Sequence, residues 1–202
     1  MSQEVSGNAA GQRVLSDSPP FIFTRILEPS SPNPEKLATT EVPRFTLALT
    51  AHERTKSRHY FEAQVFPVLG TMQSNEAYAN TAPLNTQGIY LRLPRGTVLH
   101  HDDQLTTEKE TAVLQIVAKP EAVMTAIASN PLDLVKAAYH LGNRHVSLEV
   151  TLNYLRFSPD PVLKQMLERM GLTVTDDILA FQPEAGAYGG HPPLETHHHH
   201  SH

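Results

Sequence analysis

Histidine is the residue type in this sequence best suited to chemistry, because the chain contains 12 histidines and no cysteine. Neutral imidazole binds metal ions, and an ordinary histidine titrates at about pH 6.5, so most of these side chains can act as ligands at neutral pH. Nitrogen ligands without thiolate suit Ni²⁺, Cu²⁺ or Zn²⁺, and intrinsic affinity favours copper over nickel. The sequence therefore predicts a histidine-based site for a divalent transition metal.

Histidine is densest at the C-terminal end, where five of the last six residues are histidine. Such a segment is typical of a flexible metal-capturing tail, and the alternative is an expression tag that begins at Leu194-Glu195. Thr196 and Ser201 interrupt the run, which favours a native tail. In either case the segment binds divalent metals. The predicted tail ligands are His191, His197, His198, His199, His200 and His202.

Two further histidines lie five residues apart in the C-terminal half. His140 falls inside a predicted helix and His145 lies just beyond its end, so the two side chains need not share a face. Taken alone, each is more typical of a structural residue than of a metal ligand. His145 is the better candidate, because it follows the helix stop Gly142-Asn143, where a side chain can project at the surface.

The other histidines and a row of cations have ordinary structural explanations. His100-His101-Asp102-Asp103 has the composition of a metal cluster, but a polar hairpin turn is the favoured interpretation. His52 and His59 are expected to be solvated at strand edges. The cations between them alternate in sequence: Arg54, Lys56 and Arg58. Alternation places them on one face of a strand, which we expect to be solvated, with docking of an acidic partner as the alternative.

Composition and missing motifs exclude several classes of protein. The net charge of −5 argues against nucleic-acid binding through a basic patch. No apolar run approaches the roughly 18 to 20 residues that span a bilayer, and the N-terminus lacks the apolar core of a signal peptide. The absence of cysteine excludes disulfides, thiolate zinc sites and cysteine nucleophiles. Composition thus leaves a soluble, cytoplasmic protein, and without an HExxH, GxSxG, P-loop or GxGxxG motif the sequence offers no candidate for covalent catalysis.

Residues 1–118 predict a disordered extension followed by an all-β domain. The extension, residues 1–20, is rich in proline and serine and too polar to bury a core. Residues 70–88 contain no Lys or Arg and are expected to form a long loop. Apolar runs bounded by proline or glycine predict strands at 21–27, 45–49, 59–69, 89–93, 97–99 and 113–118.

Residues 119–181 predict a second domain of alternating strands and helices. Asn130-Pro131 and Asp160-Pro161 each supply an N-cap and a first-turn proline, and Gly142 and Gly171 are the expected helix stops. The expected apolar faces are Leu134, Val135, Ala138 and Leu141 in the first helix and Leu163, Met166, Leu167 and Met170 in the second. The expected strands are 121–128, 146–150, 154–157 and 172–181. The order βαββαβ is ferredoxin-like, so the whole chain is α+β and ends in a disordered, histidine-containing tail at 182–202.

Five segments resemble, in the same order, the sequence motifs of the UreE family of urease accessory proteins. The longest is Ala138–Val146, which resembles the family's signature. The other four resemble E-R-x-K-S-R, L-P-R-G-T-V-L, D-H-V-L and F-x-P-E-x-G-A-Y: Glu53–Arg58, Leu93–Leu99, Asp160–Leu163 and Phe181–Tyr188. The resemblance covers residues 21–202. It implies that the histidine tail is native, since family members often end this way.

The resemblance implies a homodimeric nickel metallochaperone without catalytic activity. Residues 21–118 would bind a peptide or partner, and residues 119–181 would bind metal. In the family, the histidine that matches His145 lies at the two-fold interface of the C-terminal domains and shares one metal with its symmetry mate. Ni²⁺ is then a cargo for the urease apoprotein complex and its accessory GTPase, while Zn²⁺ or Cu²⁺ can bind the same sites.

Three departures from the family leave the number of metals open. Ser158–Pro161 lacks histidines that some members carry there, the 70–88 loop replaces a short turn, and the tail is short. A general histidine-based metal buffering or storage protein is the alternative function. A histidine-only metal hydrolase ranks third, because no carboxylate is placed with the histidines at ligand spacing.

Overall fold

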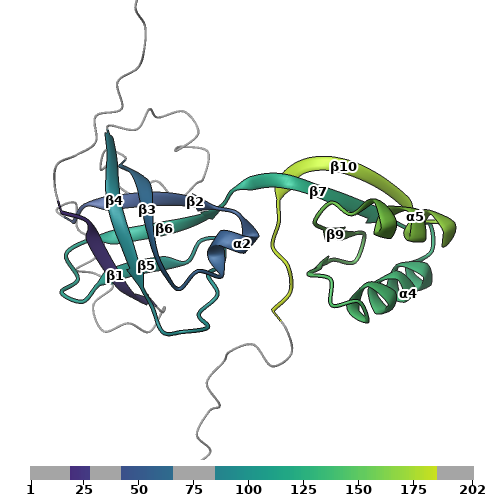
Figure 1. Cartoon of the computed structure of the whole chain (residues 1–202), viewed down its shortest axis with the longest axis horizontal. Helices are drawn as coiled ribbons and strands as arrows, with labels where there is room; N and C mark the ends of the chain where they lie inside the picture. Colours follow the sequence, from purple (N-terminus) through teal and green to yellow (C-terminus); the bar gives the residue numbers. More distant parts are fainter. Residues whose placement is uncertain (1–18, 28–41, 66–84, 186–202) are drawn as a thin grey trace, which may run out of the picture. The chain divides into compact units, whose positions relative to one another are not determined.

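The computed structural model describes residues 19–27, 42–65 and 85–185 (Figure 1). The chain forms two compact units. The first contains residues up to Ala48, Ser57–Arg95 and Leu99–Val117. The second contains Leu49–Lys56, Gly96–Val98 and the chain from Ala118 onward. The predicted extension up to residue 18, most of the predicted loop and the tail histidines lie outside the described residues.

The strands of the first unit form a closed β-barrel, which confirms the predicted all-β domain. Its described strands follow the order β1-β4-β3-β2-β6-β5, with β1 parallel to β4 and antiparallel to β5. The bounds are β1 Phe21–Ile26, β2 Arg44–Leu49, β3 Arg58–Val65, β4 Asn85–Arg92, β5 Gln104–Thr107 and β6 Val113–Ala118. Alternate residues point inward and are buried, including Phe23, Phe45, Leu47, Ile89, Leu91 and Leu114.

A four-stranded antiparallel sheet with two helices forms most of the second unit. The strand order is β10-β7-β9-β8, which confirms the ferredoxin-like arrangement. The bounds are β7 Pro120–Ile127, α4 Pro131–Gly142, β8 Glu149–Val150, β9 Leu155–Phe157, α5 Pro161–Arg169 and β10 Thr173–Ala180. Both helices pack with the sheet in one core that includes Met124, Leu134, Leu141, Phe157, Leu163 and Leu167.

The helix starts confirm the sequence prediction, and one helix end corrects it. The Asn130 side chain accepts from the Leu132 N–H, and the Asp160 carboxylate accepts from the N–H groups of Val162 and Leu163. Gly171, with φ of +89°, follows α5 as expected. Gly142, however, is the last residue of α4 and not its stop.

Helix α2, Ala51–Arg54, replaces part of an expected strand. Thr50 and Glu53 form a capping box in which each side chain accepts from the other residue's backbone N–H. The Thr50 N–H bond holds the pKa of Glu53 below its usual value. Arg54 is 3% exposed, so the predicted solvated row of three cations on one strand face is wrong. His52 is exposed on this helix, whereas His59 is exposed on β3 as predicted.

Five further differences concern short segments or single residues. Residues 97–99 form no strand, β5 was not predicted, and the expected strand 146–150 is only two residues long. Residues 85–88 belong to β4 and not to the predicted loop. Val135 is 65% exposed, and Ala137 takes its place on the buried face of α4. None of the described helices is long and apolar enough to cross a membrane.

Candidate metal site at the end of helix α4

His145 lies where helix α4 turns into the loop before β8, in a left-handed backbone conformation with φ of +57°. Its N–H donates to the Gly142 carbonyl at 2.9 Å, and the Val146 N–H donates to the Leu141 carbonyl at 3.2 Å. This pair of bonds is typical of a helix end whose left-handed residue is usually glycine. The preceding helix therefore determines both the place and the backbone conformation of His145.

The conformation of His145 is unfavourable for a residue with a Cβ atom. A left-handed conformation costs a non-glycine residue about 1–2 kcal/mol. The side chain is exposed, so burial in the core does not offset this cost. Unfavourable backbone conformations of this kind concentrate at functional sites. The geometry thus favours a functional imidazole at a position where glycine would stabilise the fold.

An exposed apolar row on α4 leads toward His145. The side chains of Leu132, Val135 and Tyr139 are 56%, 65% and 66% exposed. Their spacing of i, i+3 and i+7 places them on one face of the helix, opposite the buried Leu134 and Leu141. We call these three residues the α4 stripe. Large exposed apolar patches are typical of protein–protein interfaces, so the stripe is a candidate contact surface on the helix that ends just before His145.

The other histidines of the described chain provide no complete metal site. His140 is exposed and its ring contacts the Tyr139 ring edge-on at 5.5 Å, so it does not contribute to the core. In the turn at residues 100–103, His100 and His101 each lie 3.7–3.8 Å from an aspartate oxygen. Asp102 there has a φ of +67°, which confirms the predicted turn. Among residues 19–27, 42–65 and 85–185, no three His, Asp or Glu side chains could hold a metal together.

His145 therefore needs ligands from elsewhere to form a metal site. The predicted tail ligands His191, His197, His198, His199, His200 and His202 lie outside the described residues. A second copy of the chain is another source, because a two-fold contact brings the same residue from both copies together. The described residues contribute one imidazole, that of His145, on a backbone whose conformation is fixed by the helix end.

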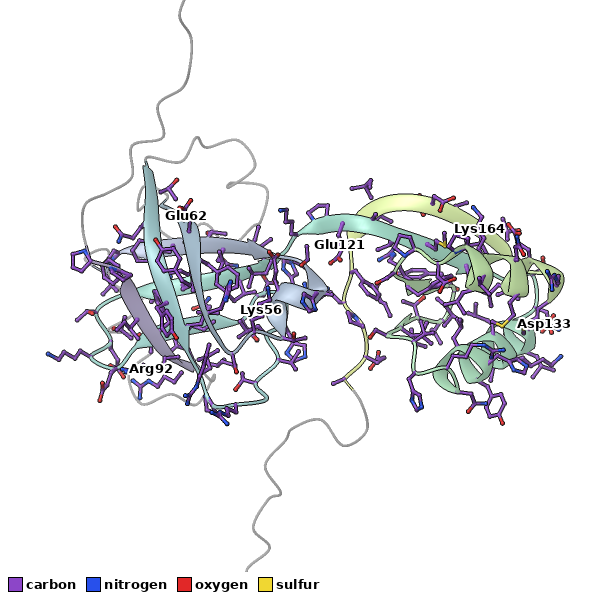
Figure 2. The ribbon with its side chains drawn as sticks, viewed as in Figure 1. Lys56, Glu62, Arg92, Glu121, Asp133 and Lys164 are labelled. Atoms are coloured by element: carbon purple, nitrogen blue, oxygen red, sulfur yellow. The ribbon has the colours of Figure 1, made fainter. Side chains whose placement is uncertain are left out.

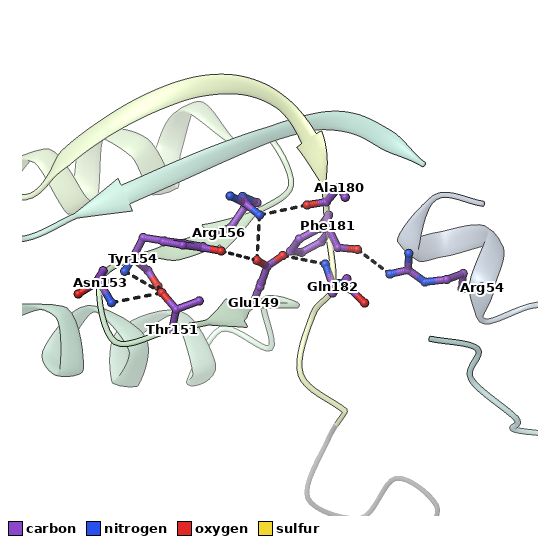
Figure 3. A network of polar contacts seen from close by, with 9 residues as sticks. All are labelled: Arg54, Glu149, Thr151, Asn153, Tyr154, Arg156, Ala180, Phe181 and Gln182. Atoms are coloured by element: carbon purple, nitrogen blue, oxygen red, sulfur yellow. Dashed lines mark hydrogen bonds and ion pairs between the residues drawn. The ribbon is translucent and has the colours of Figure 1, made fainter. Parts of the chain in front are cut away.

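The segment Ala180–Glu184 is held against the second unit by backbone hydrogen bonds, and we call it the C-terminal strap (Figure 3). The Ala180 carbonyl accepts from Arg156 Nη1 at 3.0 Å, and the Phe181 carbonyl accepts from Arg54 Nη2 at 2.6 Å. The Gln182 N–H donates to Glu149 Oε2 at 2.8 Å. The Glu184 N–H donates to the Leu148 carbonyl at 2.7 Å. The chain thus reaches its tail along a fixed path beside β8.

Glu149 is the centre of this network. Its Oε1 accepts from Tyr154 Oη and from Arg156 Nη1, both at 2.8 Å, while its Oε2 accepts from the strap. The Arg156 guanidinium also lies 4.6 Å from the centre of the Tyr154 ring. The bond to Glu149 raises the pKa of Tyr154. Sequence reasoning missed this network, because residues 149 and 182 are far apart in the chain and carry no shared motif.

The outer face of the barrel carries a second candidate surface. Tyr60 and Tyr90 are directly opposed on β3 and β4, and Ile22 on β1 is the next neighbour of Tyr90. These three side chains are 50%, 37% and 40% exposed. A Cβ atom at Gly88 would lie 2.5 Å from Tyr60 Oη, so glycine is required for the Tyr60 ring to lie over β4. The result is an exposed aromatic and aliphatic row across three strands.

Two arginines flank this row. Arg58 and Arg92 are directly opposed on β3 and β4, and within the described parts of the chain neither forms an ion pair with an acid. Glu62 lies toward the other end of the same strands (Figure 2). A surface pocket of about 310 Å³ adjoins Arg92 and is also lined by Ile22 and Lys109. Like charges opposed across strands are unfavourable in isolation, so this surface suits an acidic partner.

Comparison with known proteins identifies the family. The family model described as UreE urease accessory protein, C-terminal domain, matches residues 121–202. The urease accessory protein UreE of Nostoc punctiforme is 51% identical over 158 residues, which is 78% of this chain and 88% of that protein. The UreE proteins of Microcystis aeruginosa and Burkholderia vietnamiensis are each 43% identical, covering 86% and 77% of this chain and 95% and 68% of their own lengths. The chain therefore belongs to the UreE family of urease accessory proteins.

Proposed function

We propose that this chain is a nickel-binding metallochaperone that delivers Ni²⁺ to the urease apoprotein complex during urease maturation in the cytoplasm. Family membership supports the accessory role. The observation that carries the metal site is His145, an exposed imidazole kept in an unfavourable backbone conformation. Catalysis of a reaction is not part of this proposal.

The proposed metal site is completed in a homodimer of the C-terminal domains. If the α4 stripe of one copy packs on the same stripe of another, the His145 side chains of both copies approach the two-fold axis. The apolar stripe supplies the association energy, since one histidine per chain gives too few ligands to hold two chains together. The tail residues His191, His197, His198, His199, His200 and His202 then add ligands.

A site assembled from separate chain segments suits a cargo metal. Closed sites with four protein ligands are typical of structural metals that stay bound. Here two interface imidazoles and tail imidazoles would hold Ni²⁺, so that the tail ligands can be replaced one at a time by ligands of an acceptor. Zn²⁺ and Cu²⁺ can bind the same nitrogen ligands, because imidazole does not discriminate strongly among these ions.

The barrel is proposed to bind a partner of the same assembly. Tyrosine and arginine are enriched in the central residues of protein interfaces. The surface formed by Ile22, Tyr60, Tyr90, Arg58 and Arg92 combines both residue types with two arginines that form no ion pair within the described parts of the chain. We assign it to an acidic, partly apolar segment of the urease apoprotein complex or of its accessory GTPase.

Complementation of a strain that lacks this protein tests the proposed function. We expect the wild-type chain to restore urease activity at limiting nickel, and His145→Ala to restore little of it. A metal buffering or storage protein is the alternative function, and it predicts a different result. In that case the purified protein binds nickel, but urease activation does not depend on the chain or on His145.

A further inference from the structure

We infer that the surface pocket over strand β1 binds the side-chain carboxylate of an acidic peptide segment between Arg92 and Lys109. The assignment rests on the partner-binding surface proposed for the barrel, and it adds the residue type that this surface recognises. It also adds Lys109, which lies outside the row formed by Ile22, Tyr60 and Tyr90.

The two cations reach the pocket from opposite sides of β1. The pocket has a volume of about 310 Å³ and lies where β1 runs between β4 and β5. Phe23 on β1 is paired with Leu91 of β4 on one side and with Thr107 of β5 on the other. Arg92 directly follows Leu91, and Lys109 lies two residues after Thr107. One side chain from each neighbour of β1 therefore borders the same space.

The rest of the pocket combines apolar and hydroxyl groups. Ile22 and Thr24 are the outward-facing residues of β1 that line it, since Phe23 between them is fully buried. The other lining residues are Pro20, Phe21, Thr107, Glu108 and Thr111. Ile22 is also the next neighbour of Tyr90 in the apolar row. The pocket and the row thus form one continuous surface.

Hydrogen bonds fix the turn that carries Lys109. The Thr111 N–H donates to Thr107 Oγ1 at 3.0 Å, and the two threonine hydroxyls are hydrogen-bonded to each other at 3.0 Å. The Glu110 N–H donates to the Thr107 carbonyl at 3.1 Å, and Glu110 has a left-handed backbone with φ of +56°. The Glu110 carboxylate forms an ion pair with Arg25. The backbone at Lys109 is therefore held in place, and the neighbouring acid is paired elsewhere.

The charge of the pocket favours an anionic group. Two cations and one carboxylate line it, those of Arg92, Lys109 and Glu108. None of the three forms an ion pair within the residues that the structure describes. A carboxylate between the two cations would be attracted by both. Guanidinium groups bind carboxylates through two parallel hydrogen bonds, and such charge-assisted bonds are about twice as strong as neutral ones.

The apolar row favours a side-chain carboxylate over a chain end or a free anion. Tyr60, Tyr90 and Ile22 lie on three neighbouring strands, so the row spans about 10 Å, which an extended segment covers with about three residues. An apolar residue over the tyrosines then places an acidic residue about three positions away over β1. Terminal carboxylates are typically captured by backbone N–H groups, whereas the charged groups here are side chains. A free anion would leave the row uncovered.

Three short peptides test the pocket in the full-length protein, with binding followed by amide chemical shifts. The probes are acetyl-Leu-Ser-Ser-Glu-amide, acetyl-Leu-Ser-Ser-Gln-amide and acetyl-Leu-Ser-Ser-Gln with a free terminal carboxylate. We expect the first peptide to shift amides of β1 and of residues 107–111, and to bind about fivefold more tightly than the other two. Equal binding of all three, or no shifts in these segments at several millimolar peptide, would overturn the pocket. If the free carboxylate binds as tightly as the glutamate peptide, the assignment to a side chain is wrong.

Substitutions in the pocket should change the affinity for the glutamate peptide in opposite directions. Arg92→Met and Lys109→Met each remove one cation but keep a long side chain, and each should lower the affinity by about threefold to fivefold. Glu108→Gln removes the one acid and should raise it by about twofold. Arg95→Met is the matched control, because Arg95 is exposed and does not line the pocket. Wild-type affinity of Lys109→Met would contradict the pocket even if Arg92→Met binds weakly.

The peptides contain no part of urease, so the pocket and the proposed function can fail separately. If the glutamate peptide binds as expected but neither the accessory GTPase nor the urease apoprotein complex binds the wild-type chain, the proposed partner is wrong and the pocket stands. If these partners bind and Arg92→Glu weakens them while Lys109→Met does not, the proposed surface stands and the pocket is wrong.

Discussion

The N–H of His145 donates to the carbonyl of Gly142 at 2.9 Å, and this bond is made with His145 in a left-handed conformation. Glycine adopts that conformation without steric cost, whereas histidine does not. Metal binding therefore requires histidine at position 145, whereas stability of the helix end favours glycine. A substitution at this position can change metal binding and stability in opposite directions.

Replacing His145 by glycine should stabilise the fold while removing the metal ligand. We expect His145→Gly to raise the free energy of unfolding by about 0.5–1 kcal/mol, measured by urea denaturation of the metal-free protein. Calorimetric titration in a background whose tail histidines are replaced by alanine should show loss of the nickel site. His140→Ala is the control and should leave both quantities nearly unchanged, because His140 is exposed and outside the core. Nickel binding by His145→Gly at wild-type affinity would refute the role of His145.

The α4 stripe should hold the dimer together in the absence of metal. Val135→Glu places a carboxylate in the middle of the stripe of each copy, and two-fold packing would bury both charges in one contact. We expect the chelator-treated variant to be a monomer at micromolar concentration by light scattering, with an unchanged far-UV circular dichroism spectrum that shows the fold is kept. Val162→Glu makes the same exchange at another exposed valine, on α5, and should remain dimeric. If the chelator-treated wild type is itself a monomer, the stripe does not form a dimer contact.

The ferredoxin-like half was largely predictable because the start of each helix has a local sequence signal. Asn130-Pro131 and Asp160-Pro161 each combine an N-cap with a first-turn proline, and the structure begins both helices there. Helix α2 was missed because four residues are too short for a periodic pattern. The capping pair Thr50 and Glu53 was the available signal.

The surroundings of His145 and the contacts of the strap were harder to predict from the sequence, for different reasons. Leu134 and Val135 are adjacent apolar residues, and periodicity alone does not show that one is buried and the other exposed. Glycine is the residue type that usually adopts the left-handed conformation at a helix end, so Gly142 was the expected stop. In the structure it is His145 that adopts this conformation. The bond between Glu149 and Gln182 joins residues 33 positions apart, and no local pattern predicts it.

Reversal of one charge on the barrel should weaken partner binding without affecting nickel. Arg92→Glu places a carboxylate beside the Tyr60 and Tyr90 row and repels an acidic partner. We expect affinity for the accessory GTPase or for the urease apoprotein complex to fall by at least about tenfold, measured by biolayer interferometry with each purified partner. Arg95→Glu is the matched reversal at an exposed turn outside the row. Equal affinities of Arg92→Glu and Arg95→Glu for both partners would exclude this surface.

The contribution of Tyr154 to stability should disappear at alkaline pH. Its hydroxyl donates to Glu149 only while protonated, and that bond raises the pKa of Tyr154 above its usual value of 10.0. A raised pKa means that the folded state holds the proton more tightly than the unfolded state. The stabilisation is therefore complete below about pH 10 and is lost as the pH rises through the folded-state pKa. Urea denaturation of wild type and Tyr154→Phe should give a constant difference between pH 7 and about pH 9.5, and a shrinking difference above it. A difference that persists at pH 12 would mean that the hydroxyl stabilises the domain by a contact other than the bond that it donates to Glu149.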